Sequence, residues 1–154
     1  MAFADWFSKE NVVLDLEGGD KLEVFEELVQ RLVDSKAIPK TKKKTVLQCL
    51  MDRESLGSTG IGHGVGIPHA KIPGLKQVHT CVGIHREGVD YSAVDGEPVH
   101  IIMLILRPEE NVEEHLSFLQ WISKLGRNPD FRSFIRQSKS EREVIGVLEE
   151  MSNL

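Results

Sequence analysis

The chain has 154 residues, of which 40% are hydrophobic and 28% are charged, and its formal net charge is −5. This composition is typical of a globular protein, and the length predicts a single domain over residues 1–154. An acidic chain argues against general binding to nucleic acids or anionic membranes. Because it has neither a signal-peptide pattern nor an apolar run long enough for membrane insertion, we expect a cytoplasmic protein.

The first elements expected are a strand and a helix. Residues 11–16 (NVVLDL) predict the strand, and a Gly18-Gly19 turn follows it. Asp20 then caps a helix, with Glu23 completing a capping box. The apolar positions that fall on one face of this helix are Leu22, Phe25, Leu28, Val29, Leu32 and Val33.

A second helix is expected after Pro39, since the residue before a proline is disfavoured in a helix. Thr41 is expected to cap it, and it ends near Arg53, which places that guanidinium at its C-terminal end. The basic run 42–44 is interpreted as a solvated helix face, with a docking patch for an acidic partner as the lesser alternative. The inward positions of the helix are Val46, Leu47, Leu50 and Met51.

Strands occupy the middle of the chain and helices the end. Residues 78–85 alternate as in a half-buried strand, and residues 99–106 are continuously apolar, as in a strand buried on both faces. Three helices follow: residues 112–125, then one capped by Asn128 with Pro129 at its first position, then one that begins at Ser140 with Glu143 completing a capping box. The order predicts an α/β fold, a single three-layer α/β/α domain whose mixed central sheet is flanked by helices.

The strongest functional signal lies in residues 53–74 (RESLGSTGIGHGVGIPHAKIPG), here called the glycine segment. Five glycines and the Ser58-Thr59 pair lie between Arg53 and His69. Glycines permit close approach of the backbone, exposed N–H groups bind anions, and arginine suits phosphate. A nucleophilic imidazole among such donors indicates phosphoryl transfer. The segment lacks both GxxxxGK[ST] and a strict GxGxxG, which argues against nucleotide and dinucleotide binding.

Among the six histidines, His69 is the preferred nucleophile because a proline precedes it and the donors converge on it. His115 is either a boundary residue of a helix or a second ligand of the same group, and the role of His63 stays open. No histidines have metal-ligand spacing, so we expect no metal and no cofactor, with zinc held by His63, His69 and His115 as a minor alternative. Cys49 and Cys81 lack a CxxC motif and are expected to be buried free thiols.

These residues closely resemble the active-site signature of enzyme IIA domains of the bacterial phosphoenolpyruvate-dependent phosphotransferase system, in the mannitol/fructose and nitrogen-regulatory family. The resemblance covers essentially the whole chain. It implies that His69 accepts a phosphoryl group from an HPr-type phosphocarrier protein, that His115 hydrogen-bonds this group and that Arg53 stabilises its charge. Gly66 stands where alanine is usual. The residues that match the phosphoryl-binding loop are Ser58, Thr59, Gly60, Gly62 and Gly64.

The resemblance implies a cytosolic phosphocarrier. Because the chain carries no IIB or membrane-spanning IIC segment, we expect a standalone nitrogen-regulatory enzyme IIA. A sugar-specific enzyme IIA that passes the phosphoryl group to a separate IIB is the first alternative, and a non-phosphorylated interaction module is the second. The expected partners are an HPr-type phosphocarrier and either a IIB domain or regulatory target proteins, without nucleic acid.

Overall fold

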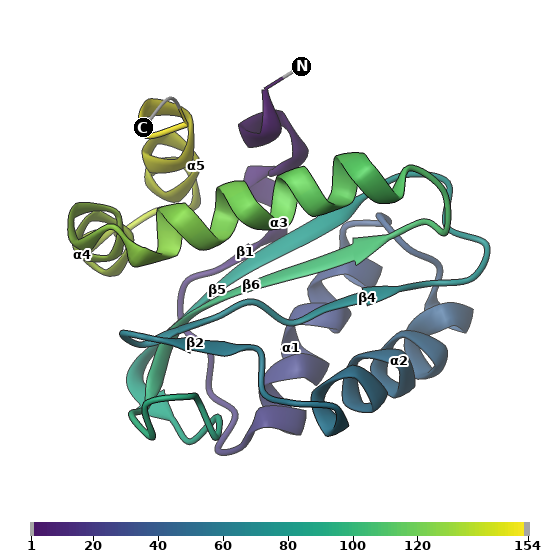
Figure 1. Cartoon of the computed structure of the whole chain (residues 1–154), viewed down its shortest axis with the longest axis horizontal. Coiled ribbons are helices and arrows are strands. Elements are labelled where there is room, and N and C mark those ends of the chain that lie inside the picture. Colours follow the sequence, from purple (N-terminus) through teal and green to yellow (C-terminus); the bar gives the residue numbers. More distant parts are fainter. Residues whose placement is uncertain (1, 153–154) are drawn as a thin grey trace.

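The computed structural model describes residues 2–152, and its centre is a mixed sheet of six strands (Figure 1). β6 (Val99–Arg107) is the central strand, with β5 (His79–Val89) antiparallel on one side and β1 (Val12–Val13) parallel to β5 beyond it. On its other side, β6 pairs in parallel with β3 (Val65–Gly66) near its start and with β4 (His69–Lys71) near its end. This arrangement confirms the predicted mixed sheet.

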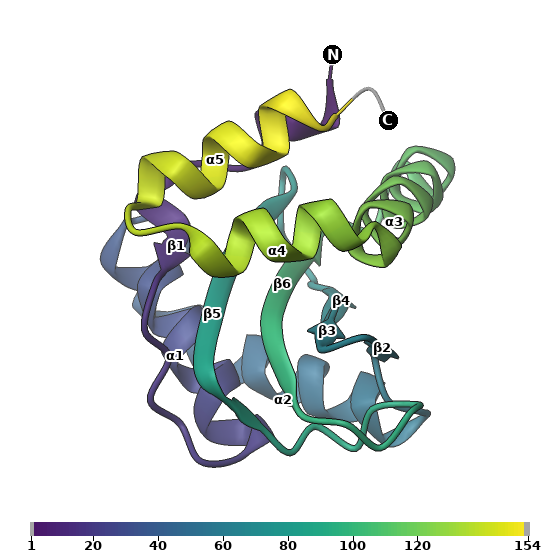
Figure 2. The ribbon, with the colours of Figure 1, turned by 90° about the vertical axis from the view of Figure 1, so that its left-hand side faces the viewer.

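Helices cover both faces of the sheet, as Figure 2 shows. α1 (Lys21–Asp34) and α2 (Lys43–Ser55) lie on one face, while α3 (Val112–Arg127), α4 (Pro129–Gln137) and α5 (Glu141–Glu150) lie on the other. The predicted three-layer α/β/α architecture is therefore confirmed. The described residues also form three short 3-10 helices, η1 (Phe3–Trp6), η2 (Lys9–Asn11) and η3 (Lys40–Lys42).

Strand β6 contributes to a hydrophobic core on each face of the sheet, as expected for a strand buried on both sides. Successive side chains of a strand point to opposite faces, so alternate residues join different clusters. The cluster with α1 and α2 includes Ile102, Leu104 and Leu106. The cluster with α3, α4 and α5 includes Ile101, Met103 and Ile105.

Helix α1 begins as predicted, since the Asp20 Oδ1 atom accepts a 2.8 Å hydrogen bond from the Glu23 N–H. Leu22, however, is 41% exposed, so its predicted inward position is wrong. At about 100° per residue, Leu22 falls at the margin of the buried stripe, and Val33, eleven residues later at the same margin, is half-buried. The fully buried residues of the stripe are Val24, Phe25, Leu28, Val29 and Leu32.

Two predicted starts of elements are wrong. The first strand is limited to Val12–Val13, because Asn11 belongs to η2 and the chain bends after Val13. Hydrogen bonding to β5 resumes at Leu16, whose N–H donates to the Ile84 carbonyl over 2.9 Å. Thr41 does not cap the second helix. It lies inside η3, which leads directly into α2 without a side-chain cap.

The Lys42-Lys43-Lys44 run is only partly solvated. The Nζ atom of Lys42 donates to the Pro73 carbonyl over 3.0 Å, and that of Lys43 donates to Gln30 Oε1 over 2.7 Å, whereas Lys44 is exposed. Two of these three ammonium groups thus fasten α2 to neighbouring segments.

The C-terminal helices agree closely with the prediction. Asn128 Oδ1 accepts from the N–H groups of Asp130 and Phe131, and Ser140 Oγ accepts from the Glu143 N–H. α3 continues past Gly126, the predicted stop. A Cβ atom there would lie 3.2 Å from side-chain atoms of both Ile61 and Val65, so this glycine allows the helix to approach the sheet closely.

Both cysteines are free thiols as predicted, although only Cys81 is fully buried and Cys49 is half-buried. Burial raises the pKa of the Cys81 thiol to about 12. Within residues 2–152, no helix combines the length and the hydropathy that crossing a membrane requires.

Candidate functional site

A pocket of about 460 Å³, here called the α2–α3 pocket, lies between helices α2 and α3 along strand β4. It brings together Arg53, His69 and His115, which come from α2, β4 and α3 respectively. The sequence could not show that these three side chains share a pocket, because their grouping depends on how the two helices flank the sheet. The full lining is Cys49, Asp52, Arg53, Leu56, His69, Ala70, Lys71, Arg107, His115, Leu116 and Leu119.

His69 is held in one tautomer by the backbone. Its Nδ1 atom lies 2.8 Å from the Ile67 carbonyl oxygen. Since a carbonyl can only accept, Nδ1 carries the proton and donates, and Nε2 keeps its lone pair. Burial lowers the pKa of His69; the Ile67 hydrogen bond partly opposes this, and nearby Arg53 adds to it. The ring is therefore neutral and nucleophilic near pH 7.

His115 lies in the first turns of α3, after Asn111, which adopts a left-handed conformation with φ of 62°. His115 as a whole residue is 5% exposed, and its Nδ1 atom has no hydrogen-bond partner within residues 2–152. Burial, followed by the charges of Arg107 and His69, lowers the pKa of His115 to about 4. The His69 and His115 ring centroids are 6.3 Å apart. The pocket thus contains a second neutral imidazole with hydrogen-bonding capacity to spare.

Arg53 lies in the last turn of α2, where its Nη1 atom donates a 3.0 Å hydrogen bond to the Gly57 carbonyl. Across residues 2–152 this is the single hydrogen bond of its guanidinium. An arginine can donate five, so most of this group remains available to an anion in the pocket.

The five predicted residues of the phosphoryl-binding loop lie outside the lining of the α2–α3 pocket. The Thr59 hydroxyl bonds to the Glu54 carboxylate and lies 2.8 Å from the Tyr91 hydroxyl, while Ser58 Oγ accepts from the Gly60 N–H. These groups therefore hold their own segment in place. The residues concerned are Ser58, Thr59, Gly60, Gly62 and Gly64.

Residues 60–66 of the glycine segment form a hairpin at the edge of the sheet, where a loop was expected. β2 (Gly60–Gly62) pairs antiparallel with β3, and the turn between them contains His63 and Gly64. His63 is exposed with φ of 57°, and its N–H donates to Asp95 Oδ2. It too lies outside the lining of the α2–α3 pocket.

Gly66 has a structural reason to differ from the alanine usual at its position. A Cβ atom there would lie 3.0 Å from Cζ of the buried Tyr91 ring. The aromatic ring thus occupies the space that an alanine methyl would need.

A buried network that the sequence did not reveal ties this hairpin to α2. The Glu54 side chain is 4% exposed and accepts from the Thr59 N–H and from Lys21 Nζ, the latter over 2.9 Å. Lys21 Nζ also lies 4.5 Å from the centroid of the Tyr91 ring, a cation–π contact. Because Glu54 follows Arg53 directly, the network fixes the end of the helix that carries this guanidinium.

Arg107 also lines the α2–α3 pocket, although the sequence did not mark it as a site residue. It ends β6, and its Nη1 atom donates over 3.1 Å to the Pro108 carbonyl. From the sequence it is merely the polar end of an apolar strand. The signal that reveals it is the pairing of β4 with β6, which places Arg107 opposite Lys71, two residues from His69.

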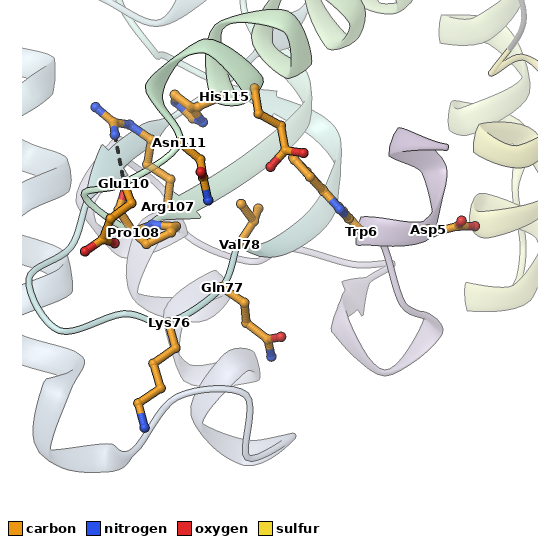
Figure 3. A pocket seen from close by; sticks show the side chains of 11 residues that line it. Asp5, Trp6, Lys76, Gln77, Val78, Arg107, Pro108, Glu110, Asn111 and His115 are labelled. Atoms are coloured by element: carbon orange, nitrogen blue, oxygen red, sulfur yellow. Dashed lines mark hydrogen bonds between the residues drawn. The ribbon is translucent and has the colours of Figure 1, made fainter. Parts of the chain in front are cut away.

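Arg107 and His115 also border a second pocket of about 490 Å³, here called the adjoining pocket (Figure 3). Its other walls come from η1, the segment before β5 and the segment before α3. Figure 3 shows Arg107 and His115 side by side, with Trp6 on another wall. Within residues 2–152, these pockets included, no group of three or more His, Cys, Asp or Glu side chains could hold a metal ion.

The fold and the paired histidines indicate a phosphotransferase-system component of the enzyme IIA class. Residues 5–151 match the family described as "Phosphoenolpyruvate-dependent sugar phosphotransferase system, EIIA 2". The chain therefore belongs to this family.

Its relatives include both regulatory and sugar-specific proteins. It is 30% identical over 142 residues to a nitrogen regulatory protein of Pseudomonas aeruginosa, covering 92% of this chain and 90% of the relative. It is also 30% identical over 148 residues to the fructose-specific EIIABC component of Bacillus subtilis, covering 96% of this chain but 23% of that longer protein. The solved structure of nitrogen regulatory protein IIA-Ntr from Neisseria meningitidis aligns with a TM-score of 0.86 at 34% identity, over 94% of this chain and 97% of that one.

Proposed function

We propose that this protein is a cytoplasmic phosphocarrier whose His69 accepts a phosphoryl group from an HPr-type phosphocarrier protein. One observation carries the proposal: the Nδ1–H of His69 is bound to the Ile67 carbonyl, so the lone pair of Nε2 is the nucleophile. Its location in a pocket with Arg53 and His115 supplies partners for the negative charge of a phosphoryl group.

The proposed reaction moves one phosphoryl group between two imidazoles. The Nε2 lone pair of His69 forms a new N–P bond, while the N–P bond to the donor histidine breaks and its electron pair returns to that ring. The Nδ1 proton of His69 stays on its nitrogen throughout and remains hydrogen-bonded to the Ile67 carbonyl. Such a transfer needs in-line approach of the two rings and stabilisation of the equatorial oxygens of the phosphoryl group. Arg53 and His115 supply this stabilisation.

The rim of the pocket suits a protein donor. Leu56 on the α2 side is 83% exposed, and Leu116 on the α3 side is 54% exposed. Exposed apolar side chains on both sides of a polar site are typical of a docking surface. A phosphoryl group added at its centre changes the charge of this surface and thereby its choice of partners.

We favour the nitrogen-regulatory branch, in which regulatory target proteins read the phosphorylation state. The solved nitrogen regulatory protein from Neisseria meningitidis is 34% identical to this chain, whereas the fructose-specific relative from Bacillus subtilis is 30% identical. The similarity to that EIIABC component nevertheless supports the sugar-specific alternative, in which a separate IIB domain receives the phosphoryl group.

The test is to incubate the purified protein with phosphoenolpyruvate, enzyme I and HPr, and to follow an acid-labile mass increase of one phosphoryl group. We expect labelling of the wild type and of His79→Gln, a control histidine outside both pockets, and none of His69→Ala. Unlabelled wild type would support a non-phosphorylated interaction module. Transfer of the label to a purified IIB domain would support the sugar-specific branch.

A further inference from the structure

We propose that Arg107 is a second phosphoryl-binding guanidinium of the α2–α3 pocket, acting together with Arg53. The role rests on the proposed function, because it requires a phosphoryl group on His69. The site would then contain two guanidinium groups, one from α2 and one from the end of β6.

The register of the sheet places Arg107 close to His69. β4 pairs in parallel with β6, so that His69 lies opposite Ile105 and Lys71 lies opposite Arg107. Residues two apart on a strand share a face, and Ile105 packs in the cluster with α3, α4 and α5. Arg107 therefore belongs to the same face of the sheet as His115, and the two side chains lie beside each other (Figure 3).

The hydrogen bonding of Arg107 leaves most of its donors available. Its guanidinium donates to the Pro108 carbonyl, and within residues 2–152 it forms no ion pair with a carboxylate. The side chain is half-buried, so its remaining N–H groups are partly withdrawn from water. A half-buried guanidinium without a counter-ion favours the arrival of an anion at this pocket.

The charge of Arg107 acts on both imidazoles. It lowers the pKa of His115 and, after burial and Arg53, contributes to lowering that of His69. In the unphosphorylated protein burial is the main cause that keeps both rings neutral, and the charge of Arg107 adds to it. Once His69 carries a phosphoryl group, the same positive charge faces about two negative charges and stabilises them. Because guanidinium groups bind phosphoryl oxygens in a bidentate manner, two of them fix both charge and orientation.

The experiment compares Arg107→Gln with Arg142→Gln, which removes an equal charge from an exposed position on α5. Each protein is equilibrated with enzyme I and HPr at a fixed ratio of phosphoenolpyruvate to pyruvate, and its phosphorylated fraction is measured relative to that of HPr. We expect the transfer equilibrium constant to fall about tenfold or more in Arg107→Gln and to remain unchanged in Arg142→Gln. Arg107→Lys keeps the positive charge but loses the forked N–H donors of the guanidinium, and its transfer equilibrium constant is expected to lie between those of Arg107→Gln and Arg142→Gln.

A second measurement separates phosphoryl binding from a structural role of the strand end. The pKa of His115, followed by NMR in the unphosphorylated proteins, is expected to rise in Arg107→Gln and to change little in Arg107→Lys. Thermal unfolding of each variant shows whether the fold is retained. If Arg107→Gln is folded and its transfer equilibrium matches that of the wild type, the phosphoryl-binding role of Arg107 is overturned, whatever the pKa of His115. If the wild type takes no label, the proposed function is overturned and this role with it.

Discussion

The rings of His69 and His115 face a common pocket with their centroids 6.3 Å apart and their planes inclined by 49°. At this separation, even rings placed edge to edge keep their nitrogens farther apart than a hydrogen bond of about 2.9 Å allows. The two imidazoles are therefore not bonded directly. The gap suits a group that is attached to one ring and accepts a hydrogen bond from the other.

Replacing His115 should weaken retention of the phosphoryl group. The bond from this imidazole to a charged oxygen is worth roughly 1.5–3 kcal/mol, so His115→Gln should lower the transfer equilibrium with HPr about tenfold or more. The measurement is the phosphorylated fraction at equilibrium, with His79→Gln as the histidine control. Equal fractions in His115→Gln and the wild type would show that His115 does not contact the phosphoryl group.

The rate at which His69 accepts a phosphoryl group from HPr should be maintained in mild acid. The pKa of His69 lies below 6.5, chiefly because of burial, so Nε2 keeps its lone pair down to a lower pH than that of an exposed histidine. Arg53→Gln removes a nearby positive charge, and its labelling rate should start to decline at a higher pH than that of the wild type. The initial rates of the two proteins, taken as a ratio at each pH, cancel the titration of HPr. A ratio that stays constant with pH would contradict this account.

Much of the fold follows from local signals in the sequence. The apolar run of β6 and the caps at Asp20, Asn128 and Ser140 depend on neighbouring residues, and the structure confirms them. The short first strand and the missing Thr41 cap depend instead on where the chain meets the rest of the sheet. Exposure of Leu22 has the same origin, because packing against the sheet sets the width of the buried stripe.

The candidate site was predicted less completely than the fold. The glycine segment itself singled out Arg53 and His69, the family resemblance added the role of His115, and the structure gathers these three in one pocket. The polar residues of the glycine segment looked like anion donors, because local sequence does not show that Glu54 and Tyr91 already engage them. Arg107 was missed for the opposite reason, since its place beside His69 arises from a pairing between distant strands.

Stability should fall in mild acid because of His115. Its pKa is about 4 in the folded protein and about 6.5 when exposed, so between these values the unfolded chain binds more protons. The free energy of unfolding should therefore decrease as the pH falls from 6.5 to 4, and His115→Gln should show a smaller decrease. The lowered pKa values of His69 and His79 act in the same direction and remain in the variant. Urea unfolding at pH 7 and pH 4.5 measures the difference, and identical decreases would contradict the prediction.

A substitution at Gly60 tests whether the glycines of the hairpin serve packing or phosphoryl binding. A Cβ atom at this position would lie 2.7 Å from Cβ and 2.8 Å from Cα of Ala93, and the backbone there cannot retreat as a flexible side chain could. Gly60→Ala should therefore destabilise the protein by about 1–3 kcal/mol. Gly146→Ala, in open space on α5, is the matched control and should be neutral or stabilising by about 0.5–1 kcal/mol.

The same variant tests what Gly60 does for the reaction. Its N–H already donates to Ser58 Oγ, and Gly60 lies outside the lining of the α2–α3 pocket. At a temperature where Gly60→Ala remains folded, its transfer equilibrium with HPr should thus stay within about twofold of the wild-type value, well short of the effect of losing one hydrogen bond to a charged group. A folded Gly60→Ala protein with a tenfold lower equilibrium constant would instead assign the backbone of this hairpin to the phosphoryl-binding site.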